Sequence, residues 1–330
     1  MSSNREKNGP LISVVSPIYN EEKNVTTLVH RLNEAFDKLG VEWELVFALD
    51  PSTDRTEEKI QELIDANFPI RMVKFSRRFG KPMSLVAGIR HCLGEATIVI
   101  DSDLQDPPDL IGAMIEKWRE GNLVVIAQRT SRQGENFFYL KSAELFYWIL
   151  DKFSEVKVPR NTGDFRLLDK RVVDEICRIN ERHGFLRGLT ALVGFKTAVI
   201  PFERDPRLTG KTQISIMGAF GIALDGIIPF SKTPIRLVLA LGLGFFGVGI
   251  GAAILWIICG LLTGIGYNWF LFGLFLFTWI FFGVTISCLG VVGEYVLRCY
   301  EDSRDRPLYI IDKIIESEKL SRKLSLEDRK

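Results

Sequence analysis

Apolar and polar positions follow two different patterns along the first 130 residues. Short, continuous apolar runs rich in Val and Ile predict strands buried on both faces, and the amphipathic stretches between them predict helices. Strands and helices in alternation are typical of an α/β fold with a doubly wound, mostly parallel sheet. The predicted strands cover residues 11–19, 43–49, 70–76, 96–100 and 123–129, and the predicted helices cover residues 21–39, 54–66, 81–92 and 108–120.

The pattern changes after residue 230, where two long apolar runs replace the alternation. The runs cover residues 237–262 and 269–293, and no charged residue occurs from Leu237 to Gly293. Each run exceeds the ~20 residues that a helix needs to cross a bilayer, so we expect a two-helix transmembrane hairpin. A buried hairpin in a soluble core is the alternative, although core helices rarely run this long without a charge. Glycine-rich faces on the runs suit close helix packing, and we expect a homo-oligomer.

Charges beside the two apolar runs predict their orientation. Lys232 and Arg236 precede the first run, and Arg298, Arg304 and Arg306 follow the second, whereas the connecting sequence TGIGYN has no charge. By the positive-inside rule the N-terminal domain and the C-terminal tail are both cytoplasmic. The opening MSSNREKNGP contains no apolar signal segment. We therefore expect a multi-pass protein of the inner (plasma) membrane.

A segment of mixed character links the charged region to the apolar runs. Residues 213–235 carry apolar side chains at helical spacing but include Asp225 and Pro229. This predicts amphipathic helices at the membrane surface, or alternatively a segment packed on the domain's own core. The expected organisation is a disordered N-terminus (1–10), a catalytic domain (11–212), juxtamembrane helices (213–235), two transmembrane helices (236–297) and a cytoplasmic tail (298–330).

Composition and missing motifs exclude several classes of protein. Lys and Arg number 42 against 41 Asp and Glu, which argues against a nucleic-acid-binding protein driven by bulk charge. The five cysteines form no disulfide or zinc pattern. No G-x-G-x-x-G follows the first strand and no phosphate-binding P-loop motif occurs, so a dinucleotide or ATP cradle is not expected.

Polar side chains follow every predicted strand. The five strand ends read PIYNEE, LDPSTDRT, SRRFGK, DSDLQDPP and QRTSRQG. Because ligands of doubly wound sheets bind at the carboxyl ends of the strands, these groups converge on one edge. Each one could be a simple cap or turn, but five together predict a ligand site.

The acidic strand end DSDLQDPP indicates what kind of ligand this is. Asp101 and Asp103 are two positions apart, so their side chains point the same way if the chain stays extended, and Gln105 continues the series. Two carboxylates and an amide suit Mg²⁺ or Mn²⁺, which commonly bridges to phosphate oxygens. An ordinary Asp-rich turn is the alternative, and Asp106 with the two prolines fits that role. The sequence therefore predicts a site for a metal-bound diphosphate.

Five segments carry a resemblance to a known family. SVVSPIYNEEKNV, DPSTDRT, FGKPMSLVAGI, DSDLQDPP and NTGDFRLLD occur in the order and spacing of family 2 glycosyltransferases of the GT-A fold, in the branch of the dolichol-phosphate mannose synthases. With two apolar runs and the closing RDRPLYII, the chain most resembles the bacterial bactoprenol (undecaprenyl-phosphate) glucosyltransferases. The resemblance covers about residues 11–312.

The resemblance implies a donor site at the strand ends. Asp101 and Asp103 would form the DXD pair that holds the metal and the diphosphate, with Gln105 as a third metal ligand and Asp103 as a catalytic residue. Lys81 would contact phosphate, or else be a solvated helix start. The implied donor-binding residues are Pro17, Tyr19, Glu21, Asp50, Lys81, Asp101, Ser102, Asp103, Arg129 and Arg207.

The resemblance also implies an acceptor site. Asp164 would be a catalytic residue, as the general base or as an orienting group for the acceptor, and a helix or turn cap is its alternative role. The basic stretch from Arg129 to Lys141 suits a lipid phosphate at the membrane surface but also fits an ordinary solvated face. The implied acceptor-phosphate residues are Arg129, Arg132, Lys141 and Arg166.

The chain departs from the family pattern at two places. In RLTGKTQ, Thr212 replaces the usual Ser and Gln213 stands where a Lys is expected, so one phosphate contact differs. At the second strand, Leu49 and Pro51 replace the first Asp and the Gly of the common D-D-G-S pattern, so a contact to the base differs.

The function implied is inverting, metal-dependent transfer of a sugar from a nucleotide sugar to polyisoprenyl phosphate. The attacking phosphate oxygen is already anionic near neutral pH, and the metal neutralises the leaving diphosphate. Glucose from UDP-glucose onto undecaprenyl phosphate is favoured. The alternatives are a GDP-mannose-dependent mannose synthase and a non-catalytic membrane scaffold. A processive synthase is disfavoured because no Q-x-x-R-W motif occurs.

Overall fold

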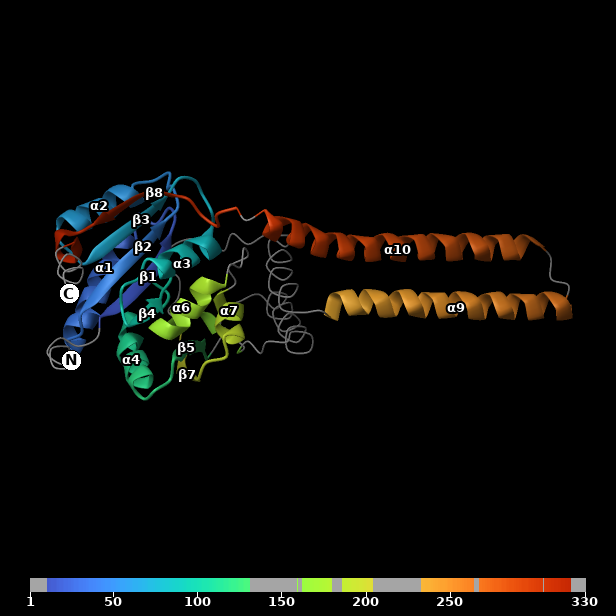
Figure 1. The fold of residues 1–330 in the computed structure, drawn as a ribbon, viewed down its shortest axis with the longest axis horizontal. Coiled ribbons are helices and arrows are strands. Elements are labelled where there is room, and N and C mark those ends of the chain that lie inside the picture. The colour runs from blue at the N-terminus through green and yellow to red at the C-terminus, as the bar shows by residue number, and fades with distance from the viewer. Residues whose placement is uncertain are drawn as a thin grey trace. The chain divides into compact units, whose positions relative to one another are not determined.

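The computed structural model describes residues 11–130, 159, 162–179, 186–203, 233–263, 267–304 and 306–321. The chain divides into two compact units. One is an α/β unit that also includes the residues from Pro307 onward, and the other contains two apolar helices, α9 (Thr233–Thr263) and α10 (Tyr267–Ser303). Figure 1 shows both units with most of their elements labelled.

The elements of the first 130 residues have the predicted alternation. The largest difference from the predicted bounds is at α1, which begins at Val25 because residues 22–24 form a turn. In chain order the elements are β1 (Ile12–Ile18), α1 (Val25–Leu39), β2 (Trp43–Leu49), α2 (Thr56–Asp65), β3 (Ile70–Phe75), α3 (Lys81–Arg90), β4 (Ala96–Val99), the 3₁₀ turn η1 (Pro108–Leu110), α4 (Ile111–Arg119) and β5 (Val124–Arg129).

The later described elements complete the sheet and its covering helices. They are β6 (Thr162–Asp169), α6 (Lys170–Arg178), α7 (Leu186–Leu192), β7 (Thr197–Phe202) and β8 (Ile311–Glu316). The eight strands lie in the order β7-β5-β6-β4-β1-β2-β3-β8. Four neighbouring pairs are parallel, whereas β6 is antiparallel to β4 and β5, and β8 is antiparallel to β3. The predicted α/β fold with a mostly parallel sheet is confirmed.

The strand order reverses beside β1. The chain passes from β1 to β2 and β3 in one direction, then crosses back to place β4 on the other side of β1. Right-handed crossovers put α1 and α3 on opposite faces, because the two connections cross the sheet in opposite directions. In agreement, α1 packs against α2 and α4, whereas α3 packs against α6 and α7. Every residue of β1 and β2 is buried between these layers, which explains their continuous apolar sequences.

An edge strand comes from the far end of the chain. β8 follows α10 and pairs with β3, from Arg71 opposite Glu316 to Phe75 opposite Ile311, and Figure 1 shows it in red along the sheet edge. Glu57 of α2 accepts from Lys74 of β3 and Lys313 of β8, at 2.7 and 2.9 Å. The sequence pattern predicts only a tail after residue 298, so β8 is a feature that it misses.

A buried ion pair joins this edge strand to the middle of the sheet. The guanidinium of Arg71 lies 2.7 Å from the carboxylate of Glu316 and 3.9 Å from that of Glu44 on β2, and it donates to the carbonyl of His91. Glu44 is fully buried and also accepts from the hydroxyl of Ser13 at 2.6 Å. Each of these charges has a partner, which is the condition for keeping them in a low-dielectric interior.

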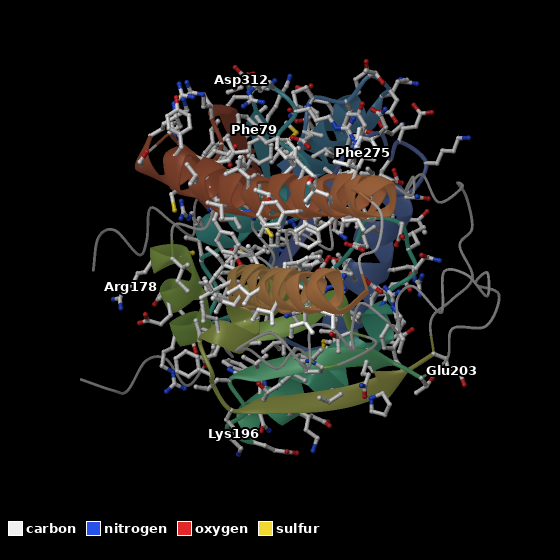
Figure 2. All side chains as sticks on the ribbon, turned by 90° about the vertical axis from the view of Figure 1, so that its right-hand side faces the viewer. Phe79, Arg178, Lys196, Glu203, Phe275 and Asp312 are labelled. Atoms are coloured by element: carbon white, nitrogen blue, oxygen red, sulfur yellow. The ribbon has the colours of Figure 1, made fainter. Side chains whose placement is uncertain are left out.

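Both long apolar runs lie within helices. α9 and α10 pack against each other, and a Cβ atom added at Gly249 would lie 3.2 Å from the ring of Phe277. Many of their large apolar side chains are exposed: Trp279 is 67% and Leu289 is 70% exposed. Phe275, which Figure 2 labels, is another of these exposed side chains. Within the described residues, the segment Gly273–Glu301 is long and apolar enough to cross a membrane, and Val238–Gly251 is a shorter apolar stretch.

Several predictions fall on residues outside those that the structure describes. They concern the N-terminus (1–10), most of the juxtamembrane segment (213–232) and three site residues, Arg132, Lys141 and Arg207.

Replacing Arg71 by Met should destabilise the α/β unit. Removal of one partner leaves the buried carboxylate of Glu44 unpaired and detaches Glu316, which costs about 3–5 kcal/mol. The expected result is a lower free energy of unfolding for the detergent-solubilised protein, measured by urea titration. Arg55→Met is the matched control, because the exposed side chain of Arg55 pairs with Glu58 and Glu62 of α2, which are exposed as well. Equal urea midpoints for the two variants would contradict the role of the buried pair.

Candidate active site

A pocket of about 220 Å³ lies where the strand order reverses. Its walls come from the ends of the four strands β1 to β4 and the segments that follow them, so four of the five predicted strand ends converge here, whereas no described residue at the end of β5 is part of the lining. The lining residues are Pro17 and Ile18 at the end of β1, Tyr19 and Glu21 after it, Asp50 after β2, Arg78, Gly80, Lys81 and Ser84 after β3, and Asp101, Ser102 and Asp103 after β4.

The acidic segment after β4 reaches the pocket by a turn. The strand ends at Val99, and Leu104 has a φ of 61°, so the extended geometry that would align Asp101, Asp103 and Gln105 is not present. The carboxylate of Asp103 accepts from the backbone N–H of Gln105 at 3.2 Å, and the Gln105 side chain is buried and is not part of the pocket lining. The hydroxyl of Ser102 donates to the carbonyl of Pro17 at 3.3 Å, which fixes this turn to the end of β1.

Asp50 fixes the loop between β3 and α3. One of its carboxylate oxygens accepts from the backbone N–H of Phe79 and the other from that of Gly80, both at 2.9 Å. Gly80 has a φ of 87°, a conformation that suits glycine. Beside it, the guanidinium of Arg78 lies 3.9 Å from the ring centroid of Tyr19. Asp50 therefore lines the pocket as predicted and also holds the loop that delivers Lys81.

Lys81 connects two carboxylates across the pocket. Its ammonium lies 2.7 and 2.9 Å from the two oxygens of Asp101 and 3.0 Å from Asp164 on β6. The other oxygen of Asp164 accepts from the guanidinium of Arg187 on α7 at 3.0 Å. Four side chains from four different parts of the fold thus form a row of alternating charge: Asp101, Lys81, Asp164 and Arg187. The sequence pattern does not single out Arg187, because no recognisable motif surrounds it. The feature that could have pointed to it is its charge within the otherwise uncharged segment FLRGLTAL.

Comparison with known proteins agrees with this geometry. The description "Glycosyl transferase family 2" matches residues 13–177, which contain the whole lining of the pocket. The chain belongs to glycosyltransferase family 2. It is 40% identical to the "Uncharacterized glycosyltransferase YkcC" of Bacillus subtilis, over 94% of this chain and 96% of that protein. It is 35% identical to the "Prophage bactoprenol glucosyl transferase homolog" of Escherichia coli, over 92% and 99%, and 36% identical to the "Bactoprenol glucosyl transferase" of Shigella phage SfV, over 91% and 97%.

In this family 2 glycosyltransferase, the electrostatics of Asp164 are set by its cationic neighbours. Burial alone would raise the pKa of its carboxyl group, but Arg187, Lys81 and Arg166 outweigh burial and hold that pKa well below its usual range. Burial would likewise lower the pKa of Lys81, yet Asp101 and Asp164 raise it above its usual value. Both groups are therefore charged at neutral pH, and a carboxylate held this firmly in its ionised form is a poor proton acceptor.

Among the described residues, two predicted phosphate-binding arginines, Arg129 and Arg166, pack at the start of β6. Arg166 is buried, and its guanidinium donates to the carbonyls of Gly163 and Asp164 at 2.6 and 3.3 Å, so it organises the start of β6. A Cβ atom added at Gly163 would lie 3.1 Å from the guanidinium of Arg129, which shows how closely that side chain packs there. Arg166 and Arg187 both line a second pocket of about 220 Å³ near β5, β6 and α7.

The carboxylate pair fits a metal ion that takes its remaining ligands from elsewhere. Within the described residues, no group of three or more His, Cys, Asp or Glu side chains is placed to hold a metal. Asp101 and Asp103 both line the pocket, however, and Asp101 already holds a cation in the form of the Lys81 ammonium. Two carboxylates with phosphate and water oxygens are the arrangement that Mg²⁺ ordinarily takes.

Replacing Asp50 by Asn should loosen the loop between β3 and α3. Hydrogen bonds to a charged acceptor contribute about 1.5–3 kcal/mol, so the amide hydrogens of Phe79 and Gly80 should exchange with solvent at least about tenfold faster. Hydrogen exchange followed by mass spectrometry measures this directly. Asp65→Asn, at the exposed end of α2, is the control and should leave the loop unchanged. Unchanged exchange in the Asp50 variant would show that the loop is held by other contacts.

Proposed function

We propose that this glycosyltransferase moves a hexose from a nucleotide sugar to polyisoprenyl (undecaprenyl) phosphate, with UDP-glucose as the favoured donor. The observation that carries the proposal is the pairing of Asp101 and Asp103 in the pocket at the strand reversal, beside the cationic Lys81. This arrangement suits a diphosphate held through a divalent cation. The choice of acceptor and sugar draws on the relatives named bactoprenol glucosyl transferases.

The donor would lie across the pocket from β1 to β4. Pro17, Tyr19, Glu21 and Asp50 offer an aromatic face and carboxylates for the nucleoside, and Arg78 and Ser102 stand nearby in the lining. Asp101 and Asp103 would hold Mg²⁺ or Mn²⁺, which supplies positive charge to the departing diphosphate. Gln105 is buried away from the pocket lining, so we propose the two aspartates without it as the protein's ligands.

The acceptor phosphate would approach from the side of β6. A phosphate monoester is anionic near neutral pH, so its oxygen can attack without a strong base, and we propose that Asp164 positions Lys81 and Arg187 instead of removing a proton. Arg187, with Arg129 and Arg166 close to the same strand, provides positive charge for the phosphate. Arg132, Lys141 and Arg207 remain proposed phosphate contacts outside the described residues.

The apolar helices would bring this chemistry to the lipid. We propose that α9 and α10 both span the inner membrane, with the catalytic unit and both termini in the cytoplasm, as the flanking arginines and lysines indicate. A polyisoprenyl chain would then share the bilayer with these helices. The close contact at Gly249 supports tight helix packing, and we propose a homo-oligomer formed through such glycine-rich faces.

The proposed reaction is tested with the purified protein, undecaprenyl phosphate and a panel of radiolabelled nucleotide sugars. We expect a lipid-linked product from UDP-glucose that disappears on addition of EDTA. Asp103→Asn should lower the transfer rate by about 10²–10³-fold, because it removes electrostatic stabilisation of the leaving group. Asp109→Asn, an exposed aspartate six residues further along, is the control. Transfer that persists in EDTA, or that Asp103→Asn leaves unchanged, would refute the metal-bound diphosphate.

The pH dependence of transfer tests the role of Asp164. Because the pKa of this carboxyl group is lowered, it becomes protonated only in acid and stays ionised throughout the neutral range. Asp164→Asn should therefore lower kcat/KM by a similar factor at every neutral pH without changing the shape of the profile. If the wild-type protein instead shows an acidic limb that vanishes in this variant, Asp164 is the general base.

A further inference from the structure

The ammonium of Lys81 lies where a metal ion would contact Asp101. It is within 2.9 Å of both oxygens of that carboxylate, so it covers the side of Asp101 that faces the pocket. A divalent cation bound by the same oxygens would meet a like charge in direct contact with them. Metal binding through Asp101 therefore requires Lys81 to move away from at least one oxygen.

Lys81 is held in this place from several directions. Asp164 binds the ammonium from the other side at 3.0 Å and is itself held by Arg187. The backbone just before Lys81 is fixed by the hydrogen bonds from Phe79 and Gly80 to Asp50. The Lys81 side chain is nevertheless 46% exposed, so the side chain alone has room to swing while the loop stays in place.

A diphosphate would change the balance of these contacts. Lys81 lines the same pocket as Asp101 and Asp103, so phosphate oxygens in that pocket would offer its ammonium a new anionic partner. Asp101 would then be released to the metal, which the same phosphates also bind. Without a nucleotide, the metal competes with the Lys81 ammonium for the Asp101 carboxylate. A bound nucleotide draws the ammonium away and ends this competition.

We propose that Lys81 is a tethered counter-ion of Asp101 that makes binding of the divalent cation and of the nucleoside diphosphate mutually dependent. The inference rests on the proposed function, since it assumes that the pocket takes a metal and a nucleoside diphosphate. By thermodynamic linkage, the nucleotide raises the affinity for the metal by the same factor as the metal raises the affinity for the nucleotide. Each ligand is consequently bound more tightly when the other is present.

The test measures Mn²⁺ binding to the full-length, detergent-solubilised protein, with and without UDP, from the electron paramagnetic resonance signal of free Mn²⁺. In the wild type, UDP should raise the affinity for Mn²⁺ at least about tenfold. In Lys81→Met, Mn²⁺ alone should bind about tenfold tighter than in the wild type, and the enhancement by UDP should shrink by a similar factor. Lys81→Gln, which keeps a polar side chain, should behave in the same way.

Lys117→Met is the matched control. Lys117 of α4 has the same exposure as Lys81, 46%, and pairs with Glu120 directly after that helix, and neither residue is part of the pocket lining. This variant should bind Mn²⁺ and UDP as the wild type does. Equal or weaker binding of Mn²⁺ alone to both Lys81 variants would overturn the counter-ion role while leaving the proposed function in place. If the wild type binds neither Mn²⁺ nor UDP, the proposed function fails together with the inference.

Discussion

The reversal of strand order beside β1 is the constraint on which the site depends. Because the chain crosses back from β3 to β4, the segments after β1 and β4 emerge next to each other, and Ser102 ties them together through the carbonyl of Pro17. β6 runs antiparallel to β4, so its beginning lies at the edge where β4 ends. For this reason Asp164, near the start of its strand, lies 3.0 Å from Lys81 of the pocket lining.

Charge neutralisation explains why so many ionised groups can share a half-buried site. Asp101, Lys81, Asp164 and Arg187 alternate in sign, so each desolvated charge has an opposite neighbour. The row is balanced before any ligand arrives. In the proposed function, a diphosphate would add only negative charge to this balance, and a divalent cation that enters with it would restore neutrality. On that proposal, the pocket would bind the two ligands together more readily than either one alone.

Local sequence patterns predict most of the sheet and much of the pocket. They do not predict contacts between residues that are far apart in the sequence. The elements from β1 to β5, and pocket residues such as Tyr19 and Lys81, follow from apolar runs and from what comes directly after them. The turn at Leu104 and the contact of Arg187 with Asp164 depend on packing that no short segment encodes. β8 is the clearest case, because its partner Arg71 lies 245 positions before Glu316.

The return of the chain to the sheet makes the two apolar helices an insertion within the α/β unit. A fragment truncated before α9, the usual way to obtain a water-soluble catalytic domain, would lose β8 along with the helices. Such a fragment would expose the hydrogen-bonding edge of β3, a surface that invites aggregation. Arg71 would also lose Glu316 and keep the carbonyl of His91 and the carboxylate of Glu44, which lies 3.9 Å away. The two apolar helices are therefore not a detachable appendage, because the α/β unit is completed by the chain that follows them.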